Sequence, residues 1–308
     1  MSEHFRNLAQ VLRSRRTARA AVSGIPLAWL LLFFLIPFLI VLKLSFSEAL
    51  LAMPPYAPLL AWTRERVLSI QLHFANYHFL FTDALYLNSF LYSVKVAAIS
   101  TLLCLLLGYP MALGITRAAP TRRNLLLMLV ILPFWTSFLL RVYAWMGLLK
   151  DDGLINNILS SLHLISQPIP MVSSPFAVYV GIVYSYLPFM VLPLYSNLEK
   201  HDRSLLEAAA DLGAPPWRAF MRITWPLSLP GVLAGALLVF IPAVGEYVIP
   251  SLLGPSNQLM IGRVLSDEFF ENRDWPVASA VAIVILIILL GPIILFQRSQ
   301  SRELEARS

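Results

Sequence analysis

Six stretches of this chain are each long and apolar enough to cross a lipid bilayer as a helix, which requires about 20 such residues. They cover approximately residues 25–46, 87–115, 125–147, 176–198, 229–250 and 277–296. Only 13% of the 308 residues are charged and 58% are hydrophobic, whereas a soluble domain carries about a quarter charged residues. We therefore predict an all-α, polytopic membrane protein with six transmembrane helices.

The first apolar stretch has features of both a signal peptide and a membrane anchor. Ser47-Glu48-Ala49 has the small-x-small pattern of a cleavage site. The apolar run at 25–42, however, is longer than the apolar region of a typical signal peptide. We interpret the stretch as an uncleaved first span.

Basic residues are distributed unevenly between the segments that connect the spans. Fifteen lie in segments on the N-terminal side, and five lie on the opposite side. Because Lys and Arg concentrate in cytoplasmic segments, we predict that both termini are cytoplasmic. The chain then divides into a basic N-terminal segment (1–24), a six-helix transmembrane domain (25–296) and a C-terminal tail (297–308).

The segment at 199–228 lies on the predicted cytoplasmic side and has the pattern of two short helices joined by a turn. Ser204 and Glu207 have the spacing of a capping box. Gly213 fits the left-handed residue that ends a helix, and Pro216 fits the first position of the next one. The pattern also fits an ordinary hairpin between spans. It disfavours a DNA-binding helix–turn–helix, because acidic residues offset the basic ones and phosphate binding needs a positive face.

This segment resembles the EAA loop of ABC importer permeases, through which an ATPase grips the membrane subunit. We call residues 199–228 the EAA loop. The pattern is carried by Glu207, Ala208, Ala209, Gly213, Ile223 and Pro226. The family pattern ends Ile-x-Leu-Pro, and Trp225 stands here in place of the Leu. The resemblance implies a MetI-like type I importer fold and a role for these residues in ATPase coupling.

The chain lacks the sequence motifs for hydrolysing ATP or binding a metal. It has no Gly-x-x-x-x-Gly-Lys phosphate loop and no His-Glu-x-x-His pair. Its single cysteine, Cys104, excludes an intrachain disulfide and a cysteine metal site. We predict a transport subunit with no catalytic residues, metal or cofactor of its own; ATP and Mg are expected on a partner ATPase.

Two segments on the predicted outer side, 154–162 and 260–270, have apolar residues at the spacing of short interfacial helices. Simple loop packing explains the same spacing. In an importer these helices would be outer-gate elements or docking surfaces for a solute-binding protein. The outer side also carries nine acidic residues against five basic ones. A negative entrance concentrates cations, although positive-inside sorting alone leaves this side poor in basic residues.

Glu246 and Arg141 are ionisable residues within apolar stretches, where such residues usually serve a function. Pro242 and Gly245 are expected to loosen the helix at Glu246. We predict a carboxylate that lines a cation path; an outer-interface Glu that reaches solvent is the alternative. Arg141 either pairs with Glu246 or reaches the interface by snorkelling. Four aromatic residues are candidates for stacking on a cation: Tyr247, Trp135, Tyr143 and Trp145. Such residues also occur in the aromatic belts at membrane interfaces.

Most of the chain from residue 25 onward is similar to the polyamine branch of these permeases. The most specific segments are FIPAVGEYVIPSLLG (240–254) and MIGRVLSDEFFENRDWPVASAVAI (260–283). The resemblance implies a subunit of a bacterial inner membrane importer for putrescine, spermidine or both. Its implied partners are a second, similar permease, two copies of a cytoplasmic ATPase and a periplasmic polyamine-binding protein, with no nucleic acid.

Two other functions are compatible with parts of the sequence. An importer for ferric iron, thiamine, sulfate or molybdate would share the EAA loop and differ in the solute path. Glu246 disfavours an anion importer, which is expected to present cations to its solute. A secondary transporter would also carry charged residues in its spans, but it has no use for an EAA loop.

Overall fold

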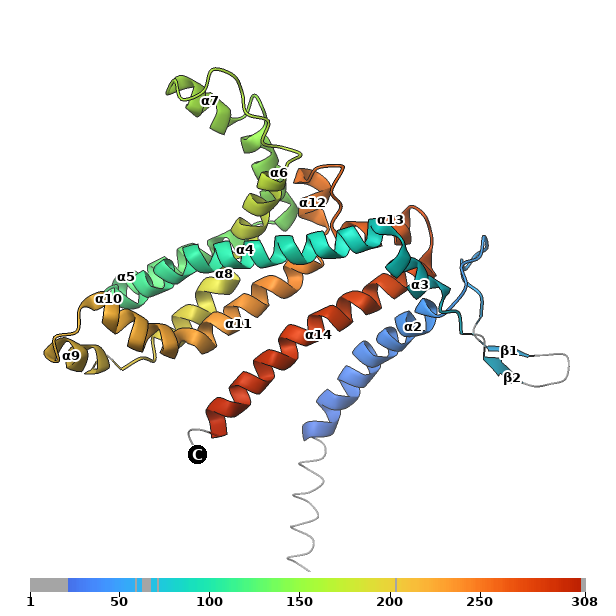
Figure 1. Cartoon of the computed structure of the whole chain (residues 1–308), viewed down its shortest axis with the longest axis horizontal. Coiled ribbons are helices and arrows are strands. Elements are labelled where there is room, and N and C mark those ends of the chain that lie inside the picture. The colour runs from blue at the N-terminus through green and yellow to red at the C-terminus, as the bar shows by residue number, and fades with distance from the viewer. Residues whose placement is uncertain (1–21, 59, 63–67, 71, 203, 306–308) are drawn as a thin grey trace, which may run out of the picture. The chain divides into compact units, whose positions relative to one another are not determined.

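The computed structural model describes residues 22–58, 60–62, 68–70, 72–202 and 204–305. These residues form two units. The first contains the described residues up to His78 together with Arg273–Ile283, and the second contains Phe79–Asn272 together with the residues from Val284 onward. Figure 1 identifies the elements of both units.

The first unit begins with an apolar helix over Val22–Ser45, in which a π-helical turn, η1 (Leu31–Leu35), leads into α2 (Ile36–Ser45). The end of α2 is fastened to α3 (Ala75–Thr82), because the Tyr77 hydroxyl donates to Ser45 Oγ at 2.7 Å. Between these helices, β1 (Leu60–Trp62) pairs antiparallel with β2 (Leu68–Ile70). This small hairpin is a departure from the otherwise confirmed all-α prediction.

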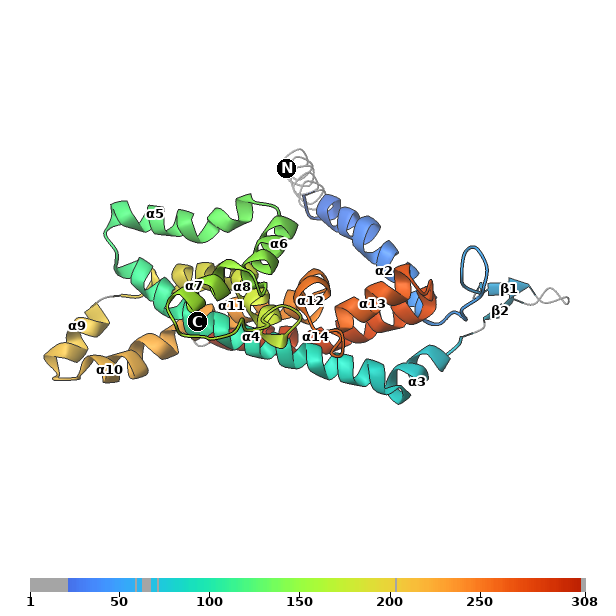
Figure 2. The same ribbon diagram turned by 90° about the horizontal axis from the view of Figure 1, so that it is seen from above.

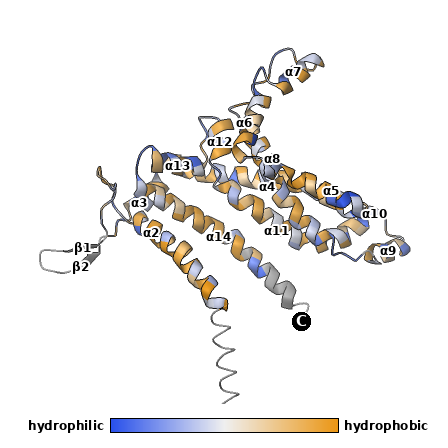
Figure 3. Ribbon diagram, turned by 180° about the vertical axis from the view of Figure 1, so that it is seen from behind, coloured by the Kyte–Doolittle hydropathy of each residue, from blue (hydrophilic) through white to orange (hydrophobic). Residues whose placement is uncertain are grey.

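The second unit is built around three long helices that pack along one another: α4 (Ala84–Arg117), α8 (Pro175–Leu198) and α11 (Trp225–Val244). Small residues allow close approach, as is usual between membrane helices. A Cβ added to Gly108 would lie only 3.0 Å from Met190 Cγ, and one added to Gly235 would lie 2.8 Å from Met190 Sδ. Figure 3 shows that hydrophobic residues predominate along these long helices.

Two hydrophobic clusters form the core of this unit. One includes Ile182, Ile249 and Leu253, and the other includes Met190 and Leu194. Tyr186 packs against both clusters. The two clusters are therefore continuous along α8.

The third predicted span is broken, which corrects the expectation of one helix over 125–147. Helix α5 (Pro120–Ile131) continues as a 3-10 turn, η2 (Leu132–Trp135), and the chain restarts as α6 (Phe138–Leu149) after two extended residues. The helical segments on the two sides of this break meet at 92° (Figure 2). Among the described residues, five helices are long and apolar enough to span a membrane, and this bent pair provides the sixth.

The fifth span also differs from its predicted bounds of 229–250. A continuous helix runs from Pro216 to Val244 through α10 (Pro216–Ala219), a π-helical turn, η3 (Phe220–Thr224), and α11. Pro242 lies inside α11, and the helix ends at Gly245. The chain resumes as α12 (Val248–Leu253). Glu246 therefore lies in a break between two helices and not within a span helix.

Both predicted outer helices are present as α7 (Leu154–Ser161) and α13 (Ile261–Phe270). They differ in packing. The apolar side chains of α7 are largely exposed, with Leu154 57% and Ile158 49% accessible, whereas Ile261 and Val264 of α13 are buried. The last span is α14 (Trp275–Glu305).

Candidate coupling and solute-path sites

The EAA loop folds as a short helix, α9 (Ser204–Asp211), followed by a sharp turn into the long helix that begins at Pro216. Gly213 has φ of +75°, the left-handed conformation that the sequence predicts. The Gly213 amide donates to Ala210 O at 2.8 Å and the Ala214 amide donates to Ala209 O at 2.9 Å. These two bonds form a Schellman motif, so Ala209 of the EAA pattern and the adjacent Ala210 supply the carbonyls that close the turn.

The start of α9 differs from the predicted capping box. The Ser204 amide donates to Asp202 Oδ1 at 2.9 Å. Hydrogen bonds from the amide and hydroxyl of Ser204 hold the pKa of Asp202 below its usual range. The Ser204 hydroxyl thus faces a carboxylate upstream, so Asp202 takes the capping role and Glu207 remains exposed.

The second half of the EAA loop is continuous with the membrane helix α11. Pro216 occupies the first helical position, as predicted, and Pro226 lies in the first turn of α11. Trp225, the departure from the family pattern, packs on Tyr109 of α4, with ring centroids 5.4 Å apart. The Tyr109 hydroxyl also lies 2.9 Å from Ser228 Oγ. The turn at Gly213 therefore leads into one continuous helix that runs through α10 and η3 into α11.

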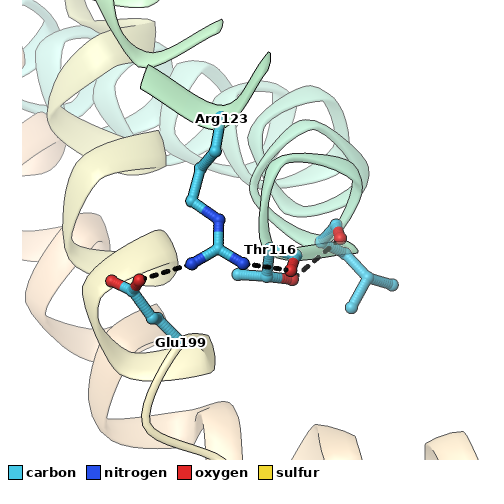
Figure 4. A network of polar contacts seen from close by, with 4 residues as sticks. Thr116, Arg123 and Glu199 are labelled. Atoms are coloured by element: carbon cyan, nitrogen blue, oxygen red, sulfur yellow. Dashed lines mark hydrogen bonds and ion pairs between the residues drawn. The ribbon is translucent and has the colours of Figure 1, made fainter. Parts of the chain in front are cut away.

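An ion pair links the start of α5 to Glu199, the first residue of the EAA loop, directly after α8 (Figure 4). Arg123 Nη1 lies 2.7 Å from Glu199 Oε1, and Arg123 Nη2 donates to Thr116 O at 3.1 Å. A pocket of about 350 Å³ lies beside this pair and is also lined by Glu207 and Ile223. In the sequence, Arg123 is only one of the fifteen basic residues that predict the membrane orientation. Its ion pair with Glu199 was not predictable, because the two residues are 76 positions apart.

Glu246 is buried at the break between α11 and α12, with 6% of its surface accessible. Its Oε1 accepts from the amides of Tyr247, Val248 and Ile249 at 3.2, 3.0 and 3.3 Å. Its Oε2 accepts a hydrogen bond from the Tyr186 hydroxyl. The carboxylate thus satisfies the first amides of α12, where a negative group is favourable.

Helix α13 begins directly against this break. A Cβ on Gly262 would overlap Gly245 O and lie 2.7 Å from Glu246 O, so only a glycine permits this contact. The preceding amide, of Ile261, donates to Ser93 Oγ of α4 at 2.7 Å. No sequence motif indicated a role for Ser93 or Gly262. Each contacts the backbone of a segment that is brought near only by the tertiary fold.

The other candidate path residues do not gather around Glu246. Among the described residues no ion pair joins Arg141 to Glu246, which was one of the two alternatives for Arg141. Arg141 donates instead to Pro133 O across the break in the third span, and its guanidinium lies 5.4 Å from the Phe134 ring centroid. The aromatic candidates differ in burial: Trp135, Tyr143 and Tyr247 are exposed, whereas Trp145 packs on Tyr184.

Residues 104–300 match the family model described as "Binding-protein-dependent transport system inner membrane component". The spermidine/putrescine transport system permease protein PotB of Haemophilus influenzae is 39% identical over 272 residues, which cover 88% of this chain and 90% of that protein. PotB of Escherichia coli K12 is 41% identical over 263 residues, which cover 85% and 90%.

A chain in the crystal structure of a bacterial alginate ABC transporter, in complex with an alginate pentasaccharide-bound periplasmic protein, has the same fold. Its TM-score is 0.67 at 17% identity, and the match covers 94% of this chain and 96% of that one.

Proposed function

We propose that this chain, which belongs to the family of binding-protein-dependent transport system inner membrane components, forms part of the path for putrescine or spermidine in an ATP-driven importer. The observation that carries this assignment is the 39% and 41% identity to two spermidine/putrescine permeases over at least 85% of the chain. A carboxylate buried at a helix break supports it, because a cationic amine that leaves water needs a compensating charge.

The EAA loop is proposed as the docking surface for a separate ATPase, which binds ATP and Mg. Its helices expose large apolar side chains: Leu205, Leu212, Trp217 and Met221 are between 42% and 88% accessible. An exposed apolar patch beside polar residues is typical of a protein contact site. Since α10 runs without interruption into α11, ATPase movement would reach the solute path through one continuous helix.

The remaining partners follow from the same family membership. We expect a second, similar permease, two ATPase copies and a periplasmic solute-binding protein, in the inner membrane of a bacterium. The uneven distribution of basic residues supports an orientation with both termini and the EAA loop in the cytoplasm.

Uptake by intact cells tests the assignment of solute. Deletion of the gene should abolish accumulation of labelled putrescine, spermidine or both, and a plasmid copy should restore it. Accumulation of sulfate, thiamine and ferric iron should be the same in both strains. If the deletion instead abolished uptake of one of those solutes and left polyamine uptake unchanged, the chain would belong to an importer for that solute.

A further inference from the structure

Tyr186 occupies a position on α8 where the two hydrophobic clusters of the second unit meet. Its ring packs against both clusters and stacks on Phe189, with centroids 6.0 Å apart. Packing from both directions restricts the ring, because side chains in close-packed interiors sit in rotamer minima and interdigitate with their neighbours. The position of the Tyr186 hydroxyl is therefore determined by the packing of α8 within the helix bundle.

The hydroxyl reaches the one Glu246 oxygen that α12 does not use. Oε1 accepts from the amides at the start of α12, whereas Oε2 accepts from Tyr186. The carboxylate is consequently held by two elements, α12 through one oxygen and α8 through the other. A buried acceptor that loses its partner carries the full cost of its desolvation. Removal of the Tyr186 hydroxyl therefore leaves Oε2 without a donor and leaves the carboxylate that caps α12 held from one side only.

The break that contains Glu246 also supports the outer helix α13 through Gly262. The orientation of the carboxylate, the start of α12 and the seat of α13 therefore depend on the same short segment. Within the second unit, Tyr186 connects this segment to a long helix of the bundle.

We infer that Tyr186 is a positioning residue for solute passage, which holds the Glu246 carboxylate between α8 and α12. This inference rests on the proposed function, in which that carboxylate faces a cationic solute. Tyr186 need not touch the solute: it sets the place and orientation of the negative group. Its removal is expected to reduce the rate of passage and to leave the docking of the binding protein and of the ATPase unchanged.

The test compares Tyr186→Phe with Tyr184→Phe in the complete complex, reconstituted with ATP inside the vesicles and spermidine-loaded binding protein outside. Tyr184 is a matched control on the same helix, whose ring packs on Trp145 at 5.4 Å. Tyr186→Phe should lower the maximal uptake rate about tenfold, equivalent to ~1.4 kcal/mol. The binding-protein concentration for half-maximal uptake and the basal ATP hydrolysis should not change. Tyr184→Phe should behave as wild type.

A second variant pair separates positioning from general damage. In a Glu246→Gln background, Tyr186→Phe should lower uptake by less than about twofold, since residues that act through one group are not additive. A full tenfold loss in that background would overturn the inference.

Hydrogen exchange provides a measurement that needs no solute. The amides of residues 247–249 should exchange faster in Tyr186→Phe than in wild type or Tyr184→Phe, because the cap on α12 loses its second support. Unchanged exchange would refute the role of Tyr186, whatever the uptake result. A wild-type complex that takes up no polyamine would count against the proposed solute alone, and the exchange result would still decide the role of Tyr186.

Discussion

Gly213 is the residue of the EAA loop at which backbone conformation most restricts substitution. Its φ of +75° is unfavourable for residues with a Cβ, and nothing else lies within 4 Å of an added Cβ. Gly213→Val should therefore strain the turn by about 1–2 kcal/mol and tilt α9 relative to α10. We expect weaker co-purification of the ATPase and less solute-stimulated ATP hydrolysis.

Gly213→Asn is the matched control, because Asn adopts the left-handed region more readily than a β-branched residue. It should retain most of the coupling. Undiminished coupling in Gly213→Val would remove this turn from the docking surface.

Glu246→Gln should greatly reduce polyamine uptake while assembly with the ATPase persists. The Gln carbonyl can still accept from the α12 amides, so the substitution removes the charge and preserves the cap. Glu268→Gln serves as a control. Glu268 Oε1 also accepts a hydrogen bond from a tyrosine, Tyr86, at 2.7 Å, but Glu268 lies in α13 and not at the helix break. Uptake near the wild-type level in Glu246→Gln would exclude a charged role for this carboxylate, and failure to accumulate would indicate a structural one.

Single residues were predictable from sequence where the backbone alone determines the outcome. The left-handed Gly213 follows from its place after a short helix. The acceptor at the start of α9 did not follow, because Ser204 and Asp202 compete for the same cap and local geometry selects Asp202. The Tyr186–Glu246 contact joins residues 60 positions apart, and tyrosines are common in membrane helices for many other reasons.

At the scale of elements, the seat of α13 on the helix break gives a sharp prediction. Gly262→Ala places a Cβ against two backbone carbonyl oxygens, which cannot rotate away as a side chain can. We expect α13 to shift and stimulated ATP hydrolysis by the complex to fall. Gly291→Ala is the control, because nothing lies within 4 Å of its added Cβ. Equal activity of both variants would show that α13 tolerates displacement.

Most helices of this fold were predictable from hydropathy, because spanning requires a long apolar run. Of the two helix breaks, the sequence indicated the one beside Glu246, through Pro242 and Gly245, but not the one in the third span. Residues 125–147 are apolar enough overall to predict one span. The 92° bend lies where Pro133 lacks an amide hydrogen and where Arg141 donates to the Pro133 carbonyl across the break. The fifth span differs from its predicted bounds because the helix continues upstream through the apolar and aromatic residues of the EAA loop as far as Pro216, and because it ends at Gly245.

At the scale of the whole molecule, this chain should transport only together with a different permease of the same class. Family membership is the reason for this expectation. Mass measurement of the detergent-solubilised complex should give one copy of this chain, one of a second permease and two of the ATPase. A functional particle with two copies of this chain and no second permease would contradict it.

This chain is proposed to form part of the polyamine path of an importer driven by ATP. The most direct measurement is uptake of labelled spermidine and putrescine by vesicles that contain the purified complex. Uptake should require ATP inside the vesicles and the solute-binding protein outside, and it should be lost when the ATPase subunit is omitted. Polyamine uptake that persists without ATP, or ATP-dependent uptake of a different solute with none of either polyamine, would contradict the account.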